Sequence, residues 1–296
     1  MKKVSISLLW IFLVSIAHSG YTRQNANNSL IQACRFNNYD QAVLAIKNGA
    51  DVNLRDFQKN TPLLYALGTK NTQLIKLLVT NNANVNVKDG KGIPLLFKAV
   101  ASAPLEIIKF LFSTSIDLNI TDNHANNAIF HISDHRLREP VLKMLIQRGV
   151  NINHKNKYQN TALHQAALIN CLYAVQILIK NGADVNMRGP FHFVPLHNAL
   201  HNGYIDIVQA LIQAGADVNL TSDKGESVLM MACYFGFTDI VKILLKAGAK
   251  IHLRTKNYPY GYGETALIKA AMKGYTIIVK MLIKHGANIK SPQEVD

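Results

Sequence analysis

The chain has 296 residues, of which 49% are hydrophobic and 8% aromatic, and it carries a formal net charge of +14 at pH 7. The apolar content supports a continuous core, and the low aromatic share fits small, aliphatic packing between helices. The basic residues do not form the clustered stripe with interleaved aromatic rings that nucleic-acid binding needs, so we expect no nucleic acid among the partners.

The first residues differ from the rest of the chain. Two lysines precede an uncharged apolar run from Val4 to Ala17, and small residues follow it. This order is typical of a secretory signal peptide, which we place at 1–19 with cleavage after Ser19, followed by a linker over 20–27. The run is shorter than the roughly 20 residues of a membrane span, so we expect no stable membrane insertion after cleavage. An uncleaved anchor or a merely hydrophobic N-terminus are the alternatives.

A short signature of the type Gly-Ala-Asp-Val-Asn then returns along the chain. Most copies follow the previous one after 33 residues, and the step from Gly248 to Gly286 is 38. The first residues of the copies are Gly49, Asn82, Ser115, Gly149, Gly182, Gly215, Gly248 and Gly286. Self-similarity at this period predicts a stacked repeat array, in which each unit buries its apolar face against its neighbours.

Each unit reads as two amphipathic helices followed by an extended arm. Apolar residues at spacings of three and four run through Thr161 to Ala167 and again through Ala174 to Ile179. The signature glycine then closes the second helix as a left-handed cap, for which Asn82 is a good substitute and Ser115 a weaker one. We therefore expect a looser helix end at Ser115.

These residues resemble the ankyrin repeat family. The segments from Thr161 to His164 and from Val194 to His197, with the Gly-Ala-Asp-Val-Asn copies, match its motifs. The resemblance covers about 28–290, leaves a polar tail at 291–296, and implies an all-α repeat solenoid of about eight helix-turn-helix units with β-fingers. The middle units, 93–126 and 127–160, are irregular in length, which puts regular stacking there in doubt.

The cysteines predict no disulfide bond. Cys34 and Cys233 occupy the same helical slot six units apart, and stacking at about 10 Å per unit separates them by roughly 60 Å. A disulfide needs Cα atoms within about 7 Å. Cys171 is no better placed, so we expect three free thiols.

Histidines raise the possibility of a metal site. His197 and His201 lie four residues apart on one expected helix, and His164 occupies the matching position one unit earlier, which is a spacing that can suit zinc. The resemblance instead implies that His164 and His197 bind backbone groups between repeats. Since no third ligand, nucleophile elbow or phosphate-binding loop accompanies them, we expect no enzyme and no cofactor.

The remaining candidate site is the interaction surface, which the resemblance places on the finger tips and the concave face of the first helices. Exposed aromatic residues suit protein binding because they offer large area for few rotatable bonds. At the tips these are Phe57, Tyr158, Phe191, Phe193, Tyr258, Tyr260 and Tyr262, and the groove-facing set is Tyr65, Phe97, His131, His201, Tyr234 and Met272. The alternatives are that the tip rings fold back onto neighbouring fingers and that part of the groove set is core.

We therefore expect a secreted or periplasmic, non-catalytic scaffold that is monomeric and binds another protein, for which an acidic protein is one option. The strongest partner-binding candidates are Phe191, Phe193, Tyr258, Tyr260, Tyr262, Tyr158 and Tyr234. The resemblance to exported bacterial ankyrin proteins suggests inhibitor, immunity or stabilising roles. An effector delivered into a host cell, and a metal-binding protein around His164, His197 and His201, remain as alternatives.

Overall fold

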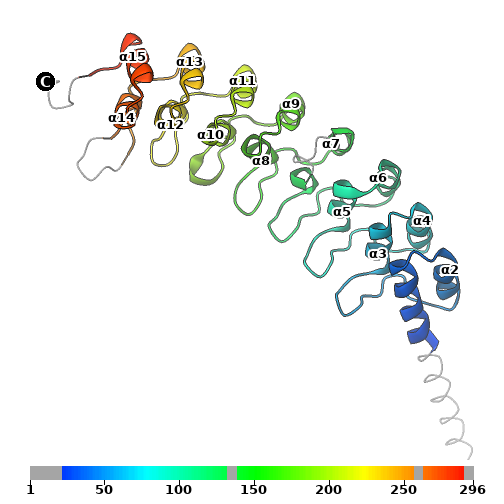
Figure 1. Ribbon diagram of the computed structural model, residues 1–296. Coiled ribbons are helices and arrows are strands. Elements are labelled where there is room, and N and C mark those ends of the chain that lie inside the picture. The colour runs from blue at the N-terminus through cyan, green and yellow to red at the C-terminus, as the bar shows by residue number, and fades with distance from the viewer. Residues whose placement is uncertain (1–21, 132–138, 257–262, 290–296) are drawn as a thin grey trace, which may run out of the picture. The chain divides into compact units, whose positions relative to one another are not determined.

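The computed structural model describes residues 22–131, 139–256 and 263–289 (Figure 1). The chain divides into two compact units, unit 1 up to Asn123 and unit 2 from His124. The division falls among the repeats whose lengths are irregular. Each unit consists of helix pairs joined by loops, as expected for an all-α repeat solenoid.

Unit 1 begins with a helix over 22–35, so the segment expected to be a linker is helical from residue 22. Ala26 is buried in this helix, and the Asn27 side chain accepts a hydrogen bond from the Asp51 backbone N–H at 2.8 Å, which ties the helix to the first signature. The later helices are α2 (Tyr39–Lys47), α3 (Pro62–Thr69), α4 (Thr72–Thr80), α5 (Leu95–Ser102) and α6 (Leu105–Phe112).

Unit 2 continues the pattern of paired helices and contains four successive pairs, from α8 and α9 to α14 and α15. Its elements are η1 (Ala128–His131), α7 (Glu139–Gln147), α8 (Ala162–Leu168), α9 (Leu172–Lys180), η3 (Pro190–His192), α10 (Pro195–His201), α11 (Ile205–Gln213), α12 (Val228–Phe235), α13 (Thr238–Lys246), α14 (Ala266–Met272) and α15 (Thr276–Lys284). The first helices α8, α10, α12 and α14 contact one another in an inner row, and α9, α11, α13 and α15 form an outer row (Figure 1).

Helix ends follow the capping chemistry that the sequence indicates. The Thr61 hydroxyl accepts from the Leu64 N–H, and Pro62 follows at the first helical position, where its missing N–H costs nothing. All six signature glycines adopt a positive φ, and Asn82 does so at 66°. Ser115 is not among these left-handed residues. The helix α6 ends at Phe112, three residues before Ser115, whereas α4 ends at Thr80, two residues before Asn82.

The last asparagine of the signature links adjacent repeats. The Asn186 Oδ1 accepts from the Asp217 N–H at 2.8 Å, while its Nδ2 donates to the Gly215 carbonyl at 3.2 Å. Asn53, Asn86, Asn153 and Asn219 make the same pair of bonds to the next repeat. The repeated Asn is therefore an inter-repeat clamp.

The loops between repeats carry little β-structure in the described residues. Isolated antiparallel bridges join Lys88 to Pro94 and Thr221 to Ser227. Side-chain bonds fix the remaining turns, as where the Asp89 carboxylate accepts from the Lys91 and Ile93 N–H groups at 2.9 Å each.

The structure corrects one expected groove residue. Phe97 was expected to face the groove, but it is buried. The N-cap of α5 is Pro94 rather than Ile93, so Phe97 lies three residues after the cap, where His164 and His197 are also buried. Lys98 lies four residues after the cap, the position that Tyr65 holds in its own repeat, and its Nζ pairs with the Asp89 carboxylate at 2.8 Å.

None of the three cysteines forms a disulfide bond, as expected, and all three are buried. Burial raises the pKa of the Cys34 and Cys233 thiols to about 12, so neither is a reactive thiolate at neutral pH.

Candidate functional site

Two adjoining hollows on the first helices of unit 2 form a continuous groove, called the inner groove below. One, of about 240 Å³, lies between α8, η3, α10 and α12. The other, of about 410 Å³, lies between α10, α12 and α14. They share the side chains of Phe193, His201 and Met231, so a partner can occupy both at once.

A strained loop holds two phenylalanines at one end of the inner groove. Phe191 and His192 have positive φ angles of 54° and 59°, a conformation that costs a non-glycine residue about 1 kcal/mol or more. The Asp223 N–H donates to the Phe191 carbonyl at 3.0 Å, and the Gly189 N–H donates to the Phe193 carbonyl at 2.7 Å. The Phe191 side chain is 68% exposed. Strain that keeps an apolar ring in water indicates a functional position.

Phe193 rests on a buried histidine. Its ring stacks on the His197 imidazole with 5.0 Å between centroids and 7° between planes. The His197 Nδ1 accepts from the Val194 N–H at 3.3 Å, so Nε2 carries the proton and donates to the Glu226 carbonyl at 3.4 Å. Burial lowers the pKa of His197 to about 4, so a neutral, fixed imidazole supports the Phe193 ring.

The other end of the inner groove combines aromatic rings with cations. The Phe235 ring lies 5.9 Å from the His201 ring and 5.3 Å from the Tyr234 ring, centroid to centroid. The ammonium groups of Lys273 and Lys269 lie 4.3 and 5.3 Å from the Tyr234 centroid. These cation–π contacts fix the Tyr234 ring at the edge of the groove.

Two carboxylates hold Lys269 in place. Its Nζ lies 2.8 Å from the Glu226 Oε1 and 3.2 Å from the Glu264 Oε2. Burial by itself lowers the pKa of the Lys269 ammonium, but its hydrogen bonds to Glu226 and Glu264 and their negative charges raise the pKa above its usual range. The side chain is therefore a charged, fixed part of the groove wall.

The buried histidines have no nitrogen left for a metal ion. The His164 Nδ1 accepts from the Thr161 N–H at 3.2 Å, and its Nε2 donates to the Phe193 carbonyl at 3.2 Å. His197 uses both nitrogens in the same way, as the resemblance implied. Among the described residues, no group of three His, Cys, Asp or Glu side chains is arranged to hold a metal.

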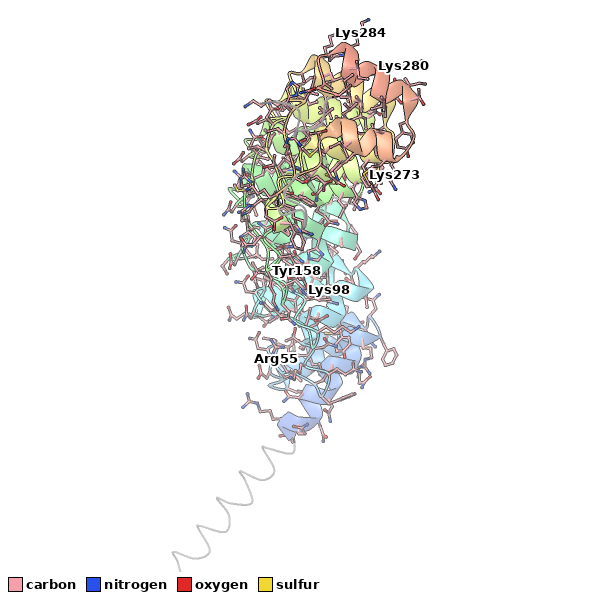
Figure 2. The ribbon with its side chains drawn as sticks, turned by 90° about the vertical axis from the view of Figure 1, so that its left-hand side faces the viewer. Arg55, Lys98, Tyr158, Lys273, Lys280 and Lys284 are labelled. Carbon is pink, nitrogen blue, oxygen red and sulfur yellow. The ribbon has the colours of Figure 1, made fainter. Side chains whose placement is uncertain are left out.

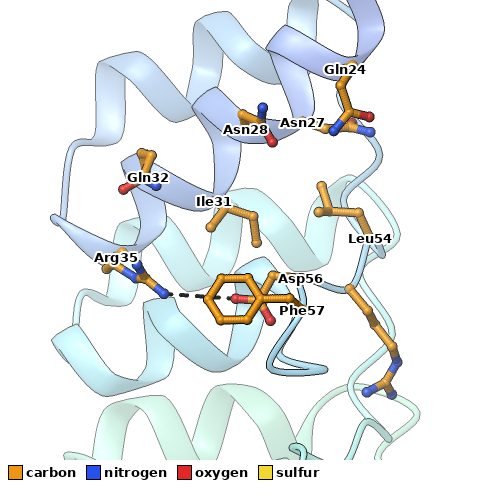
Figure 3. A pocket seen from close by; sticks show the side chains of 10 residues that line it. Gln24, Asn27, Asn28, Ile31, Gln32, Arg35, Leu54, Asp56 and Phe57 are labelled. Atoms are coloured by element: carbon orange, nitrogen blue, oxygen red, sulfur yellow. Dashed lines mark ion pairs between the residues drawn. The ribbon is translucent and has the colours of Figure 1, made fainter. Parts of the chain in front are cut away.

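Unit 1 contains a more polar hollow of about 360 Å³ beside its first helix (Figure 3). Arg35 and Asp56 lie across it with 3.9 Å between their charged atoms, and the Tyr65 hydroxyl bonds to both side chains. Phe57 lies in front of this pair and is 88% exposed. Because its polar groups already satisfy one another, this hollow is less suited than the inner groove to bury a partner.

Comparison with known proteins identifies the family. A model of ankyrin repeats in three copies matches residues 30–122, 96–189 and 196–293, and a second ankyrin model matches 169–212. The chain belongs to the ankyrin repeat family. No curated protein matches it.

Ankyrin repeats generally serve as protein–protein interaction modules, and ankyrin repeat proteins are typically non-catalytic scaffolds. Within the part of the chain that the structure describes, no helix is long and apolar enough to cross a bilayer. The inner groove lies on the first helices of successive ankyrin repeats, so its residues come from several repeats at once.

The structure separates the aromatic candidates into groups. Phe191, Phe193 and Tyr234 all line the inner groove. Tyr158 does not, because its ring stacks on that of His124 in the preceding loop with 5.9 Å between centroids. This ring folds onto a neighbouring finger. Three further candidates lie outside the described residues: Tyr258, Tyr260 and Tyr262.

Of the other residues expected at the groove, His201 lines it and Met272 is exposed on α14.

Sequence reasoning missed three residues of the inner groove: Met231, Phe235 and Lys269. Met231 and Lys269 lie four residues after the caps Ser227 and Thr265, the position of Tyr65 in its own repeat, and this shared position was the signal available. The role of Lys269 could not be read from spacing, because its carboxylate partners come from two different loops.

Proposed function

We propose that this protein is an exported ankyrin scaffold that binds a partner protein through the inner groove of unit 2 and has no catalysis of its own. The observation that carries the proposal is the continuous aromatic groove from Phe191 to Tyr234. Rigid aromatic side chains in a hollow are what binding hot spots require, since they bury much apolar area at little cost in rotamer entropy.

Pre-organisation of the inner groove supports binding rather than simple packing. Phe193 is fixed by His197, Tyr234 by two lysines and Phe191 by a strained loop. A surface ordered before binding loses less conformational entropy when the partner arrives. The finger tips, including Tyr258, Tyr260 and Tyr262, would extend the contact area beyond the groove.

The finer architecture and the location belong to the same proposal. We place eight stacked repeats with finger-like hairpins along residues 28–290, a cleaved signal peptide at 1–19, and the mature monomer in the periplasm or outside the cell. The full chain carries +14, and loss of Lys2 and Lys3 with the signal peptide leaves the mature chain still basic, which favours an acidic partner. Support comes from the eight signature copies and from the basic, apolar start of the chain.

Affinity capture with the mature chain from its own organism, followed by a variant comparison, tests the binding proposal. The first variant replaces Phe191, Phe193 and Tyr234 with alanine, and the second replaces Tyr258, Tyr260 and Tyr262. A control variant replaces Phe57, which is exposed in unit 1. The groove variant should lose the partner at least about tenfold in affinity, the difference made by about 1.4 kcal/mol, while the control retains it.

Equal binding by the groove variant and the wild type would show that the inner groove is not the docking site. Cell fractionation tests export separately. Retention in the periplasm supports the scaffold, whereas appearance inside a host cell would support delivery as an effector.

A further inference from the structure

A second, basic hollow lies on the outer helices, between α13 and α15. It has a volume of about 510 Å³. Four lysines and two apolar side chains form most of its lining: Lys242, Lys246, Lys280, Lys284, Ile277 and Met281. Figure 2 shows Lys280 and Lys284 on α15 extending into solvent, apart from Lys273 beside α14. We call this site the basic hollow.

The basic hollow lacks the acidic partners that would neutralise it. Lys242 pairs with Asp239 in the first turn of its own helix, at 3.0 Å. Within the described part of the chain, Lys246, Lys280 and Lys284 form no ion pair. Like charges gathered in this way repel one another, so an anionic partner would relieve an unfavourable interaction.

Unit 1 shows the arrangement that unit 2 lacks. On its outer helices, the Lys76 ammonium of α4 pairs with Glu106 of α6 at 3.2 Å. The equivalent positions in α13 and α15 are Lys242 and Ile277, because each lies at the same place in its helix. The counter-charge has thus been replaced by an isoleucine.

Ile277 is an unusual residue for this position. Its side chain is 67% exposed, whereas Glu106 and Asp239 occupy the same place in other repeats. Lys246 and Lys284 lie in the last turns of their helices, where a cation also stabilises the carbonyl end, so their presence has an ordinary explanation. An exposed isoleucine surrounded by lysines has no such explanation from helix stability.

We propose that the basic hollow is a second docking site, which binds an acidic amphipathic segment of a partner protein. Carboxylates of the segment pair with Lys246, Lys280 and Lys284, and an apolar side chain packs on Ile277 and Met281. The surface recedes between two helices, which suits a narrow peptide segment. A flat anionic bilayer would instead contact the lysine tips and leave the hollow unfilled.

This site goes beyond the proposed function, because it lies on the outer row of helices and the inner groove lies on the inner row (Figure 1). No residue lines both sites. The basic hollow is lined by residues such as Lys242, Ile277 and Lys280, and the inner groove by residues such as Phe193 and Tyr234. Each can therefore be removed without the other.

The test measures fluorescence anisotropy of labelled peptides with the purified mature chain. The first probe is a synthetic helical peptide of about four turns with glutamates on one face and leucines beside them. The second is a peptide of the same composition with the order scrambled, which keeps the charge but loses the apolar face. Vesicles of phosphatidylcholine and phosphatidylglycerol provide the membrane comparison.

The variant that decides the matter is Ile277→Glu, which recreates the arrangement of Lys76 and Glu106 and should fold normally. We expect it to weaken binding of the amphipathic peptide about tenfold. Gln73→Glu adds the same charge at the same helical position of α4 and should leave binding unchanged. Lys280→Glu with Lys284→Glu should abolish binding, while Lys109→Glu, at the repeat position of Lys280 on α6, should not.

Three outcomes would overturn the proposal. Equal binding of the amphipathic and scrambled peptides would show general charge attraction only. Binding to vesicles but not to the peptide would assign the surface to a membrane. Loss of the peptide in a Phe193→Ala and Tyr234→Ala variant would assign the peptide to the inner groove. Retention of peptide in that variant, with loss in Ile277→Glu, supports the basic hollow whatever becomes of the inner groove.

Discussion

The imidazole of His197 and the ring of Phe193 stack almost parallel, 5.0 Å apart. This contact joins the fold to the candidate site, because the same imidazole bridges two repeats through the Val194 N–H and the Glu226 carbonyl. The residue that fixes the spacing of the repeats thus also fixes an aromatic side chain of the inner groove. A change in the charge of His197 should therefore affect both the packing of the two repeats and the position of the Phe193 ring.

The first prediction concerns pH. Burial lowers the pKa of His164 and of His197 to about 4, whereas both titrate near 6.5 in an unfolded chain. Between these values the unfolded state binds more protons, so the free energy of unfolding should fall as the pH drops from about 6.5 to 4. Each histidine should contribute up to about 3 kcal/mol to this loss.

Urea unfolding at several pH values checks this prediction. A variant with His164→Gln and His197→Gln is less stable at pH 7 but lacks the two titrating groups, so its stability should fall less steeply over this pH range. Parallel curves for the variant and the wild type would show that other groups cause the pH dependence.

Much of the fold could be predicted because the repeat is dictated by local chemistry. A left-handed helix end favours Gly or Asn, so Gly182 and Asn82 mark their helix ends correctly. Phe97 was misplaced because the unit was taken to begin at Ile93, whereas the cap is Pro94, 33 residues after the Thr61 cap, and a shift of one residue moves a side chain from the groove to the core. The 33-residue step from the Thr61 cap leads to Pro94, so the period locates this cap better than the type of the capping residue, which is neither Thr nor Ser here.

The inner groove could be predicted only in part. Phe191, Phe193 and Tyr234 stand out as aromatic residues on exposed elements, and they do meet in one groove. The Lys269 pairing depends on two carboxylates from different repeats, and sequence spacing does not contain that information. The stacking of Tyr158 on His124 likewise depends on how two loops approach each other.

A second prediction concerns the asparagine clamp. Asn186→Ala removes one bond to the Asp217 N–H and one to the Gly215 carbonyl, which should cost about 1–2 kcal/mol of stability. Gln213→Ala removes an exposed amide at the end of α11 and should change stability by less than about 0.5 kcal/mol. Urea unfolding of both variants makes the comparison, and equal stabilities would argue against the clamp.

A third prediction uses two equivalent glycines. Gly236 and Gly274 have φ angles of 78° and 72° at the same repeat position, but only Gly236 is crowded. A Cβ on Gly236 would meet the Tyr275 ring at 2.6 Å, whereas a Cβ on Gly274 would meet nothing within 4 Å. Gly274→Ala should cost about 1 kcal/mol for the left-handed backbone, and Gly236→Ala should cost more.

Thermal unfolding of the two glycine variants measures the difference directly, since the backbone penalty is common to both. If Gly236→Ala were no less stable than Gly274→Ala, the Tyr275 ring would have to move without cost.

A fourth prediction concerns the charged wall of the inner groove. Lys269→Met leaves Glu226 and Glu264 facing each other without the ammonium, and the loss of these charge-assisted bonds should cost about 1–3 kcal/mol. Lys273→Met removes an exposed cation from the same Tyr234 ring and should be nearly neutral. Urea unfolding separates the two, and comparable losses would contradict a structural role specific to Lys269.

The fifth prediction sets stability against binding at Phe191. This residue has a φ of 54° and is 68% exposed, so its ring adds little to the core while its backbone is strained. Phe191→Gly removes the steric penalty of the left-handed conformation and increases the entropy of the unfolded chain, and these effects should leave stability within about 1 kcal/mol of the wild type. Phe193→Gly loses the stacking on His197 at an extended backbone position and should be clearly destabilising.

If the inner groove binds a partner, Phe191→Gly should nevertheless weaken the complex, as titration calorimetry with the captured partner would show. A stable Phe191→Gly protein with undiminished affinity would mean that the strain at this loop serves no binding role.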